Sequence, residues 1–196
     1  ILRAVQNLRA GLQHYGTPQF ARQARMAFMA RAFLRSLTEN GPADDEGKTW
    51  FSQEDTDAFM QSISTVSTEF EKDFRAFSMD EISRAEFNEK YGHLRVGTYD
   101  IRTERYDQMN FRPGPSKSKG KAEAREDALN PGRLAEALKE VGLQVSVEQL
   151  LHFIRYAIEQ REYFKFEFTK SLSLILELLV RAGNEMEIAR NDLSWL

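Results

Sequence analysis

The longest regular pattern in the chain covers residues 147–182, which read VEQLLHFIRYAIEQREYFKFEFTKSLSLILELLVRA. Apolar residues recur there every three or four positions, as on one face of an α-helix, and no Gly or Pro interrupts them. Ser146 predicts the N-cap of this helix, and Gly183-Asn184 predicts its end. The expected inward side chains are Leu150, Leu151, Ile154, Ile158, Phe168, Leu172, Ile175 and Leu179.

One short piece of this stretch also fits another structure. Residues 164–168, FKFEF, alternate apolar and charged side chains with the period of two that is typical of a β-strand. The flanking residues keep the helical period and contain no helix breaker. They favour one continuous helix, around which the rest of the chain must pack.

The N-terminal part predicts two helices in sequence. Residues 1–14 carry one apolar stripe, and the run Tyr-Gly-Thr-Pro at 15–18 predicts a stop followed by a new helix. Thr17 would be the N-cap of the second helix and Pro18 its first residue. We expect this second helix to reach about Thr38 and a polar acidic loop to follow over 39–49.

A third helix is expected to begin after Ser52, which with Asp55 forms an N-terminal capping pattern. Its apolar stripe is regular and rich in phenylalanine, and it predicts one long helix with an aromatic seam for a facing helix. The stripe consists of Phe59, Ile63, Val66, Phe70, Phe74 and Phe77.

Shorter elements complete the pattern. Ser83 and Glu86 predict a capped short helix that ends at Tyr91, and further helices are expected over 132–141 and 190–196. Residues 112–121, RPGPSKSKGK, contain turn residues and lysines and predict a flexible linker that extends over 112–130. The sequence thus predicts one all-α domain over 1–196, an irregular bundle of five to seven helices, two of them long, with one extended Gly-containing loop.

Composition narrows the class of protein. The 196 residues suffice for one sizeable core, and 41% hydrophobic with 29% charged residues lies in the globular range. The chain contains no cysteine and therefore forms no disulfide, which fits a cytoplasmic protein. It also contains no run of eighteen apolar residues, so the sequence predicts no membrane-spanning helix. Because residue 1 already lies within a helical pattern and is not Met, we expect the chain to be a piece of a larger protein.

Charge is distributed unevenly along the chain. Residues 1–38 contain six arginines and no acid, whereas residues 39–90 have a net charge of −9. The simpler interpretation places the arginine-rich helices beside the acidic ones within one domain. The alternative is an arginine-lined surface for an anionic partner, which suits the guanidinium group. Nucleic acid is disfavoured as that partner because the aromatic residues follow core spacing and do not interleave with the basic ones.

Residues 90–101, KYGHLRVGTYDI, form the most concentrated group of polar and glycine residues in the chain. Two glycines allow close backbone approach, and His, Arg and Asp side chains can donate, accept or titrate. A loop of this kind between two helices is a candidate site.

The same residues resemble a known family. Residues 91–101, together with Arg105-Tyr106-Asp107, are similar to a signature of phosphoenolpyruvate-synthase-like proteins, whose superfamily includes pyruvate phosphate dikinase and rifampicin phosphotransferase. One departure is Val96, where proline is expected in the family; valine leaves the loop less stiff. Further similar segments are 20–22, 34–37, 59–66, 161–170 and 192–196, so that the resemblance covers nearly all of the chain except 112–130.

The resemblance implies a phosphotransferase that moves a phosphoryl group from ATP to a histidine and then to an acceptor. This reaction needs an ATP-grasp domain and a mobile phosphohistidine domain, and the chain shows the sequence pattern of neither. The chain also contains no Gly-rich phosphate loop and no pair of residues with the spacing of metal ligands. We therefore expect no catalytic residue, metal or cofactor in the chain itself. ATP and Mg²⁺ would belong to the parent protein, and the partners would be those two domains and a small-molecule acceptor, with neither nucleic acid nor membrane.

Within the signature, a neutral His93 would accept a proton from an acceptor hydroxyl, and Arg95 would hold a phosphate or carboxylate. Asp100 would orient either group. The full set of expected substrate-binding residues is His93, Arg95, Thr98, Asp100, Arg105 and Tyr106.

Two alternatives remain open at this point. His93 and Asp100 would instead hydrogen-bond to the loop backbone while Arg95 pairs with an acid of the third helix, since a loop must satisfy its own polar groups. In that case the chain would be a non-catalytic helical scaffold or oligomerisation domain, with the phenylalanine seam as its contact surface and the uneven charge distribution as further support.

Overall fold

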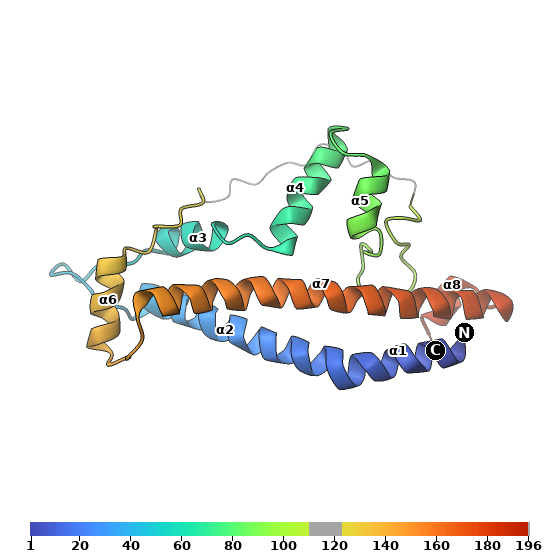
Figure 1. Cartoon of the computed structure of the whole chain (residues 1–196), viewed down its shortest axis with the longest axis horizontal. Coiled ribbons are helices and arrows are strands. Elements are labelled where there is room, and N and C mark those ends of the chain that lie inside the picture. Colours follow the sequence, from blue (N-terminus) through green and yellow to red (C-terminus); the bar gives the residue numbers. More distant parts are fainter. Residues whose placement is uncertain (110–122, 196) are drawn as a thin grey trace. The chain divides into compact units, whose positions relative to one another are not determined.

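A computed structural model of the chain describes residues 1–109 and 123–195, and in that part all regular elements are helices (Figure 1). The longest is α7 (Val147–Glu185), with 39 residues. An unbroken helical segment from Leu2 to Glu39 is the other long element. The predicted all-α class with two long helices is therefore confirmed.

The N-terminal segment contains no stop at residues 15–18. It consists of α1 (Leu2–Gly11), a π-helical turn (Leu12–Gly16) and α2 (Thr17–Glu39). Pro18 has no N–H for the regular helical bond, and the wider turn before it accommodates this defect: the N–H of Thr17 donates to the carbonyl of Leu12, five residues back. The predicted helix end was wrong because a π turn absorbs the proline.

The expected third helix is two helices. They are α3 (Gln53–Gln61) and α4 (Val66–Ser78), separated by a serine- and threonine-rich link at 62–65. The Ser62 hydroxyl donates to the Phe59 carbonyl at 2.7 Å and so competes for the backbone groups that would continue the helix. The prediction of one long helix was wrong because the apolar period continues across a link that is not helical.

The remaining helices begin and end close to their predicted positions. They are α5 (Arg84–Tyr91), α6 (Pro131–Glu140), α7 and α8 (Arg190–Leu193). Local bonds explain this agreement: Ser83 and Glu86 form a complete capping box, and the Ser146 hydroxyl accepts the N–H of Gln149 at 3.1 Å. Residues 164–168 lie within α7, so the strand alternative is excluded.

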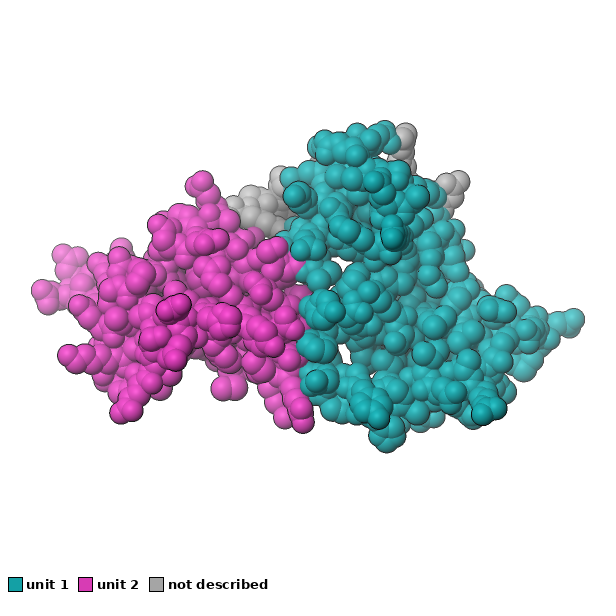
Figure 2. Space-filling view, viewed as in Figure 1, with its two compact units in different colours: residues 1–21, 66–116, 163–196 teal, residues 22–65, 117–162 magenta. Residues whose placement is uncertain are grey.

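The chain forms two compact units, each assembled from segments distant in sequence (Figure 2). Unit 1 comprises residues 1–21, 66–116 and 163–196, and unit 2 comprises residues 22–65 and 117–162. The sequence pattern predicts one domain, and two of the boundaries of this division, 21/22 and 162/163, fall inside the continuous helices α2 and α7.

Unit 2 has a mainly aliphatic core. Leu129, which is 1% exposed, belongs to that core, and the N–H of Arg125 donates to the Ala58 carbonyl at 3.1 Å. Residues 123–130 of the predicted linker are thus anchored on the unit, whereas residues 112–122 of that prediction lie outside the described residues. The buried core residues are Ala30, Leu34, Leu37, Phe51, Phe59, Ile63, Leu129, Leu134, Ile154, Ala157 and Ile158.

Unit 1 is centred on an aromatic cluster. We use this term for Phe70, Phe74, Phe77, Phe87, Tyr91, Tyr106 and Phe166. Phe77 and Phe87 stack with ring centres 4.9 Å apart, and the Tyr91 hydroxyl donates to Asp73 Oδ2 at 3.0 Å. The predicted phenylalanine seam is therefore divided between the cores of the two units.

Along the described part of the chain, none of the helices combines the length and the apolar character that crossing a bilayer requires.

Candidate functional site

The predicted site residues lie on a loop that follows α5 in unit 1. This signature loop, residues 92–109, folds back on itself: the N–H of Tyr106 donates to the Leu94 carbonyl at 2.9 Å, and the N–H of Asp107 to the Gly92 carbonyl at 3.1 Å. At Gly92 a Cβ atom would lie 2.5 Å from the Asn88 carbonyl oxygen, so this turn requires glycine. The two arms of the loop are thus joined close to α5.

The tip of the loop is a compact turn that we call the outer turn, residues 97–103. The N–H of Asp100 donates to the Gly97 carbonyl at 3.0 Å, and the N–H of Thr103 to the Asp100 carbonyl at 3.2 Å. The Thr103 hydroxyl also lies 2.9 Å from the Asp100 carbonyl. These bonds hold the turn in one shape without a regular element.

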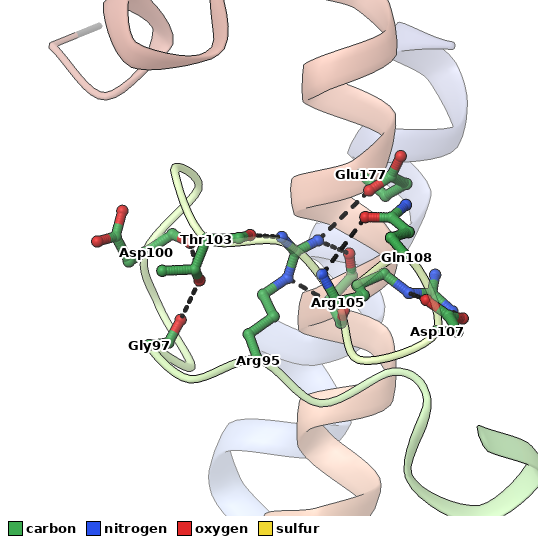
Figure 3. A network of polar contacts seen from close by, with 9 residues as sticks. Arg95, Gly97, Asp100, Thr103, Arg105, Asp107, Gln108 and Glu177 are labelled. Atoms are coloured by element: carbon green, nitrogen blue, oxygen red, sulfur yellow. Dashed lines mark hydrogen bonds and ion pairs between the residues drawn. The ribbon is translucent and has the colours of Figure 1, made fainter. Parts of the chain in front are cut away.

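Arg95 joins this loop to α7 (Figure 3). Its side chain is 1% exposed. Nε donates to Ser173 Oγ and Nη2 donates to the Ser173 carbonyl, both at 3.3 Å. Nη1 donates to the Thr103 carbonyl of the same loop. Nη2 also lies 3.5 Å from Glu177 Oε2. Burial lowers the pKa of Arg95, and Glu177 opposes that shift. The guanidinium group is therefore directed at the protein itself, and the acid beside it comes from α7, not from the expected third helix.

His93 is half-buried against the same face of α7. Its ring meets Phe166 edge-on at 4.8 Å, and Nε2 lies 3.4 Å from Thr169 Oγ1. The Thr169 hydroxyl donates its only proton to the Phe166 carbonyl at 2.6 Å, so we assign the proton of this contact to His93 Nε2. Burial, with smaller contributions from Lys170 and Arg105, lowers the pKa of His93 to about 4. The imidazole is thus neutral near pH 7, with its lone pair on Nδ1.

Arg105 and Tyr106 also have contacts within the loop and unit 1. Arg105 Nε donates to Asp107 Oδ1 at 3.0 Å, and a second bond joins Nη2 to Oδ2. The Tyr106 ring stacks on Phe70 with ring centres 6.2 Å apart, and burial raises the pKa of its hydroxyl. Both side chains therefore contribute to the packing of the loop.

An open hollow of about 740 Å³ lies beside the outer turn. Of the expected binding residues, Thr98 and Asp100 line it, while His93, Arg95, Arg105 and Tyr106 do not. The predicted set is thus divided between an inner group and an outer group. The lining consists of residues 97–102 of the loop, Leu176 and Leu179 of α7, Leu193, Ser194 and Trp195.

The charged pair at this hollow is Asp100 with Arg102. Asp100 Oδ1 accepts Arg102 Nε at 2.9 Å and Oδ2 accepts Nη2 at 2.8 Å; these bonds hold the pKa of Asp100 down, at about 2. The Arg102 side chain is 57% exposed, and its Nη1 has no hydrogen bond to any described residue. An ionised, oriented pair with free donor capacity therefore faces the hollow.

The sequence reasoning did not select Tyr99, Arg102 or Trp195, which line the hollow. For Arg102 a local signal existed: the carboxylate of Asp100 accepts the backbone N–H two residues on at 2.9 Å, as Asp commonly does in turns. For Trp195 none existed, because its place beside the outer turn depends on the fold of unit 1.

No cluster of three or more His, Cys, Asp or Glu side chains that would hold a metal ion occurs within residues 1–109 and 123–195.

No protein-family model matches the chain, and comparisons with curated proteins and with solved structures found no similar protein.

Proposed function

We propose that the chain is the acceptor-binding helical region of a phosphoenolpyruvate-synthase-like ATP-dependent phosphotransferase. In this proposal ATP-grasp and phosphohistidine domains of the same cytoplasmic polypeptide use ATP and Mg²⁺ to phosphorylate a histidine. The present chain holds a small-molecule acceptor and catalyses no step itself. The resemblance of residues 91–101 and 105–107 supplies the reaction class.

The observation that supports a binding role is the hollow at the outer turn. Its volume of about 740 Å³ falls within the usual range for small-molecule sites. Leucines from α7 provide apolar surface, while Thr98 and Arg102 provide a hydroxyl and an incompletely used guanidinium group. Such a combination suits an acceptor with an apolar body and a hydroxyl or anionic group.

The buried residues of the loop serve this site indirectly in the proposal. Arg95 is a positioning residue, because it joins the outer turn to α7 through Thr103 and Ser173. A rigid turn orients its ligand groups before binding and lowers the ordering cost of the complex. His93 does not line the hollow, so we assign it no contact with the acceptor.

The first test is the complete coding sequence. ATP-grasp and phosphohistidine regions are expected in the same polypeptide, and a complete polypeptide that lacks them would overturn the phosphotransferase proposal. The second test uses the full-length protein with Thr98→Val and Arg102→Ala. Both variants should lower acceptor phosphorylation about tenfold or more and leave ATP-dependent histidine phosphorylation intact.

Arg3→Ala is the matched control, because Arg3 is an exposed arginine of unit 1 that does not line the hollow. It should change neither reaction. Unchanged acceptor phosphorylation in both outer-turn variants would remove the hollow as the acceptor site.

A scaffold role has lost one of the two features that the sequence suggested for it, while the uneven charge distribution remains. The phenylalanine seam proposed as a contact surface packs inside the two units, with Phe59 0% and Phe77 7% exposed. A contact surface must be sought elsewhere.

A further inference from the structure

The exposed half of α2 is basic, and its arginines form no ion pair with a described residue. The arginines at 22, 25, 31 and 35 all lie in unit 2 and are exposed. Residues 1–38 contain no acidic side chain. The expected pairing of these arginines with acidic helices of the same domain is therefore not observed as ion pairs. A concentration of like charge on one helix gains stability when an opposite charge covers it.

The same side of α2 also exposes two large apolar side chains. Phe28 is 66% and Met29 64% exposed, although Ala27 and Ala30 beside them are buried in the unit 2 core. At 100° per residue, Phe28 and Met29 project away from the buried face together with Arg25. The helix is thus apolar on its inner face and partly apolar on its outer face, as expected of a helix that is covered on both.

The residue types on this outer face match those of protein interfaces. Arginine, methionine and phenylalanine are enriched in interface cores, whereas lysine is depleted, and residues 1–38 contain six arginines and no lysine. The guanidinium group pairs with carboxylates through two parallel bonds, which a lysine cannot form. This composition favours a protein partner with carboxylates.

Unit 2 itself carries a surface of that chemistry. Between α2 and the middle of α3, the segment 39–57 contains seven acids and one lysine. Five of the acids are exposed and form no ion pair with any described residue: Asp44, Asp45, Glu46, Glu54 and Asp57. One unit therefore presents both a basic and an acidic surface, and neither is neutralised by the other.

We infer that the chain associates with a second copy of itself, the outer face of α2 of one copy binding the acidic segment 44–57 of the next. The two surfaces differ, so the contact is heterologous and each copy keeps one free surface of each kind. Phe28 and Met29 would supply the apolar centre of the contact and the arginines its charged rim. The association does not depend on the proposed acceptor site, which lies in unit 1.

Sedimentation velocity of the 196-residue chain tests this inference. At about 50 mM salt the mean sedimentation coefficient should rise with protein concentration, and at about 500 mM salt it should fall towards the monomer value because ions screen the charges. The double variant Arg22→Glu/Arg25→Glu and the double variant Asp45→Lys/Glu46→Lys should each weaken self-association about tenfold or more.

A mixture of these two variants provides the sharpest measurement. Each variant retains one intact surface, and the reversed charges of the two altered surfaces are opposite to each other, so the mixture should recover the association that neither variant shows alone. Arg3→Glu/Arg9→Glu is the matched control, because it makes the same change of charge on α1 in unit 1 and should leave self-association unchanged.

Several results would overturn the inference. A wild-type chain that stays monomeric at all concentrations would exclude the contact, and so would association that salt or the α2 variants do not weaken. The monomer could instead bind vesicles containing phosphatidylserine, or single-stranded RNA, through Arg22 and Arg25. In that case the outer face of α2 would be a lipid-binding or RNA-binding surface, and the inference would be wrong.

Discussion

Arg95 and Arg102 lie in the same loop, yet the protein uses them in opposite ways. The Arg95 side chain is 1% exposed and bonds to Thr103 and Ser173, whereas that of Arg102 is 57% exposed and bonds to Asp100 two residues away. Arg95 joins segments that are distant along the chain, whereas Arg102 forms a local ion pair with Asp100 beside the hollow. Residue type and position in a polar loop do not distinguish an anchor from a ligand-facing group; burial and partners do.

The same contrast divides the whole signature loop. Its inner part, with His93, Arg95 and Tyr106, packs on α7 and the aromatic cluster, while Thr98 and Asp100 of its outer turn line an open hollow. We expect changes in the inner part to alter stability and changes in the outer turn to alter binding. The following measurements test that division.

The largest effect is expected for Arg95→Ala. This change leaves the Ser173 hydroxyl, the Thr103 carbonyl and the Glu177 carboxylate without their cationic partner. Breaking a buried charged contact of this kind costs about 3–5 kcal/mol in the free energy of unfolding, measured by urea denaturation. Arg95→Lys should restore only part of the loss, because an ammonium group lacks the planar fork. A loss below about 1 kcal/mol in the alanine variant would contradict the anchoring role.

His93 should make stability depend on pH. Its pKa is about 4 in the folded protein and about 6.5 when unfolded, so the unfolded state binds more protons in this interval. The contribution of the neutral ring is complete above about pH 6.5 and is lost as the pH falls towards about 4. Because the ring is only half-buried, we expect a loss of about 1–2 kcal/mol.

The measurement compares urea denaturation of the wild type and His93→Gln between these pH values. The variant should show a smaller decrease on acidification, and His152→Gln, at an exposed position on α7, should retain the full decrease. Equal slopes for wild type and His93→Gln would show that His93 gains its proton without cost to the fold.

A smaller difference is expected between two tyrosines of the same region. Tyr91→Phe removes the bond to Asp73 from a side chain that is 2% exposed, which should cost about 1 kcal/mol in unfolding free energy. Tyr99→Phe, at a residue that is 70% exposed on the outer turn, should leave unfolding unchanged. A comparable loss in both variants would mean that the outer turn is as tightly packed as the inner part.

The smallest effect on stability is expected for Arg102→Ala. Its pair with Asp100 is exposed to solvent, and such pairs contribute little to folding. The urea midpoint should therefore stay within experimental error of the wild type, while acceptor phosphorylation in the full-length protein decreases. A clear fall in the midpoint would place Arg102 with the structural residues.

Features that depend on neighbouring residues were predicted well. The starts of α3 after Ser52 and of α5 after Ser83 follow from capping boxes between residues three positions apart. Two boundaries were missed although the interactions that set them are also local. A π turn carries the chain past Pro18, and a link at 62–65 interrupts an apolar period that continues on both sides of it.

The candidate site shows the limit of sequence reasoning more clearly. The sequence singled out the loop through its glycines and polar side chains, and Thr98 and Asp100 do line a hollow. The sequence could not predict that Arg95 bonds to α7, because its partner Ser173 is 78 residues away along the chain. Nor could the sequence show that Trp195 lines the same hollow as Thr98.

By itself, the sequence determined that this protein is helical, where most of its helices begin and end, and which loop is polar and glycine-rich. These properties depend on side-chain periodicity and on hydrogen bonds between residues a few positions apart. Only the tertiary structure decided which side chains of that loop are buried, how the phenylalanines divide between two cores, and which arginines form no ion pair with a described residue. Those outcomes depend on contacts between segments distant along the chain, and local sequence carries no record of them.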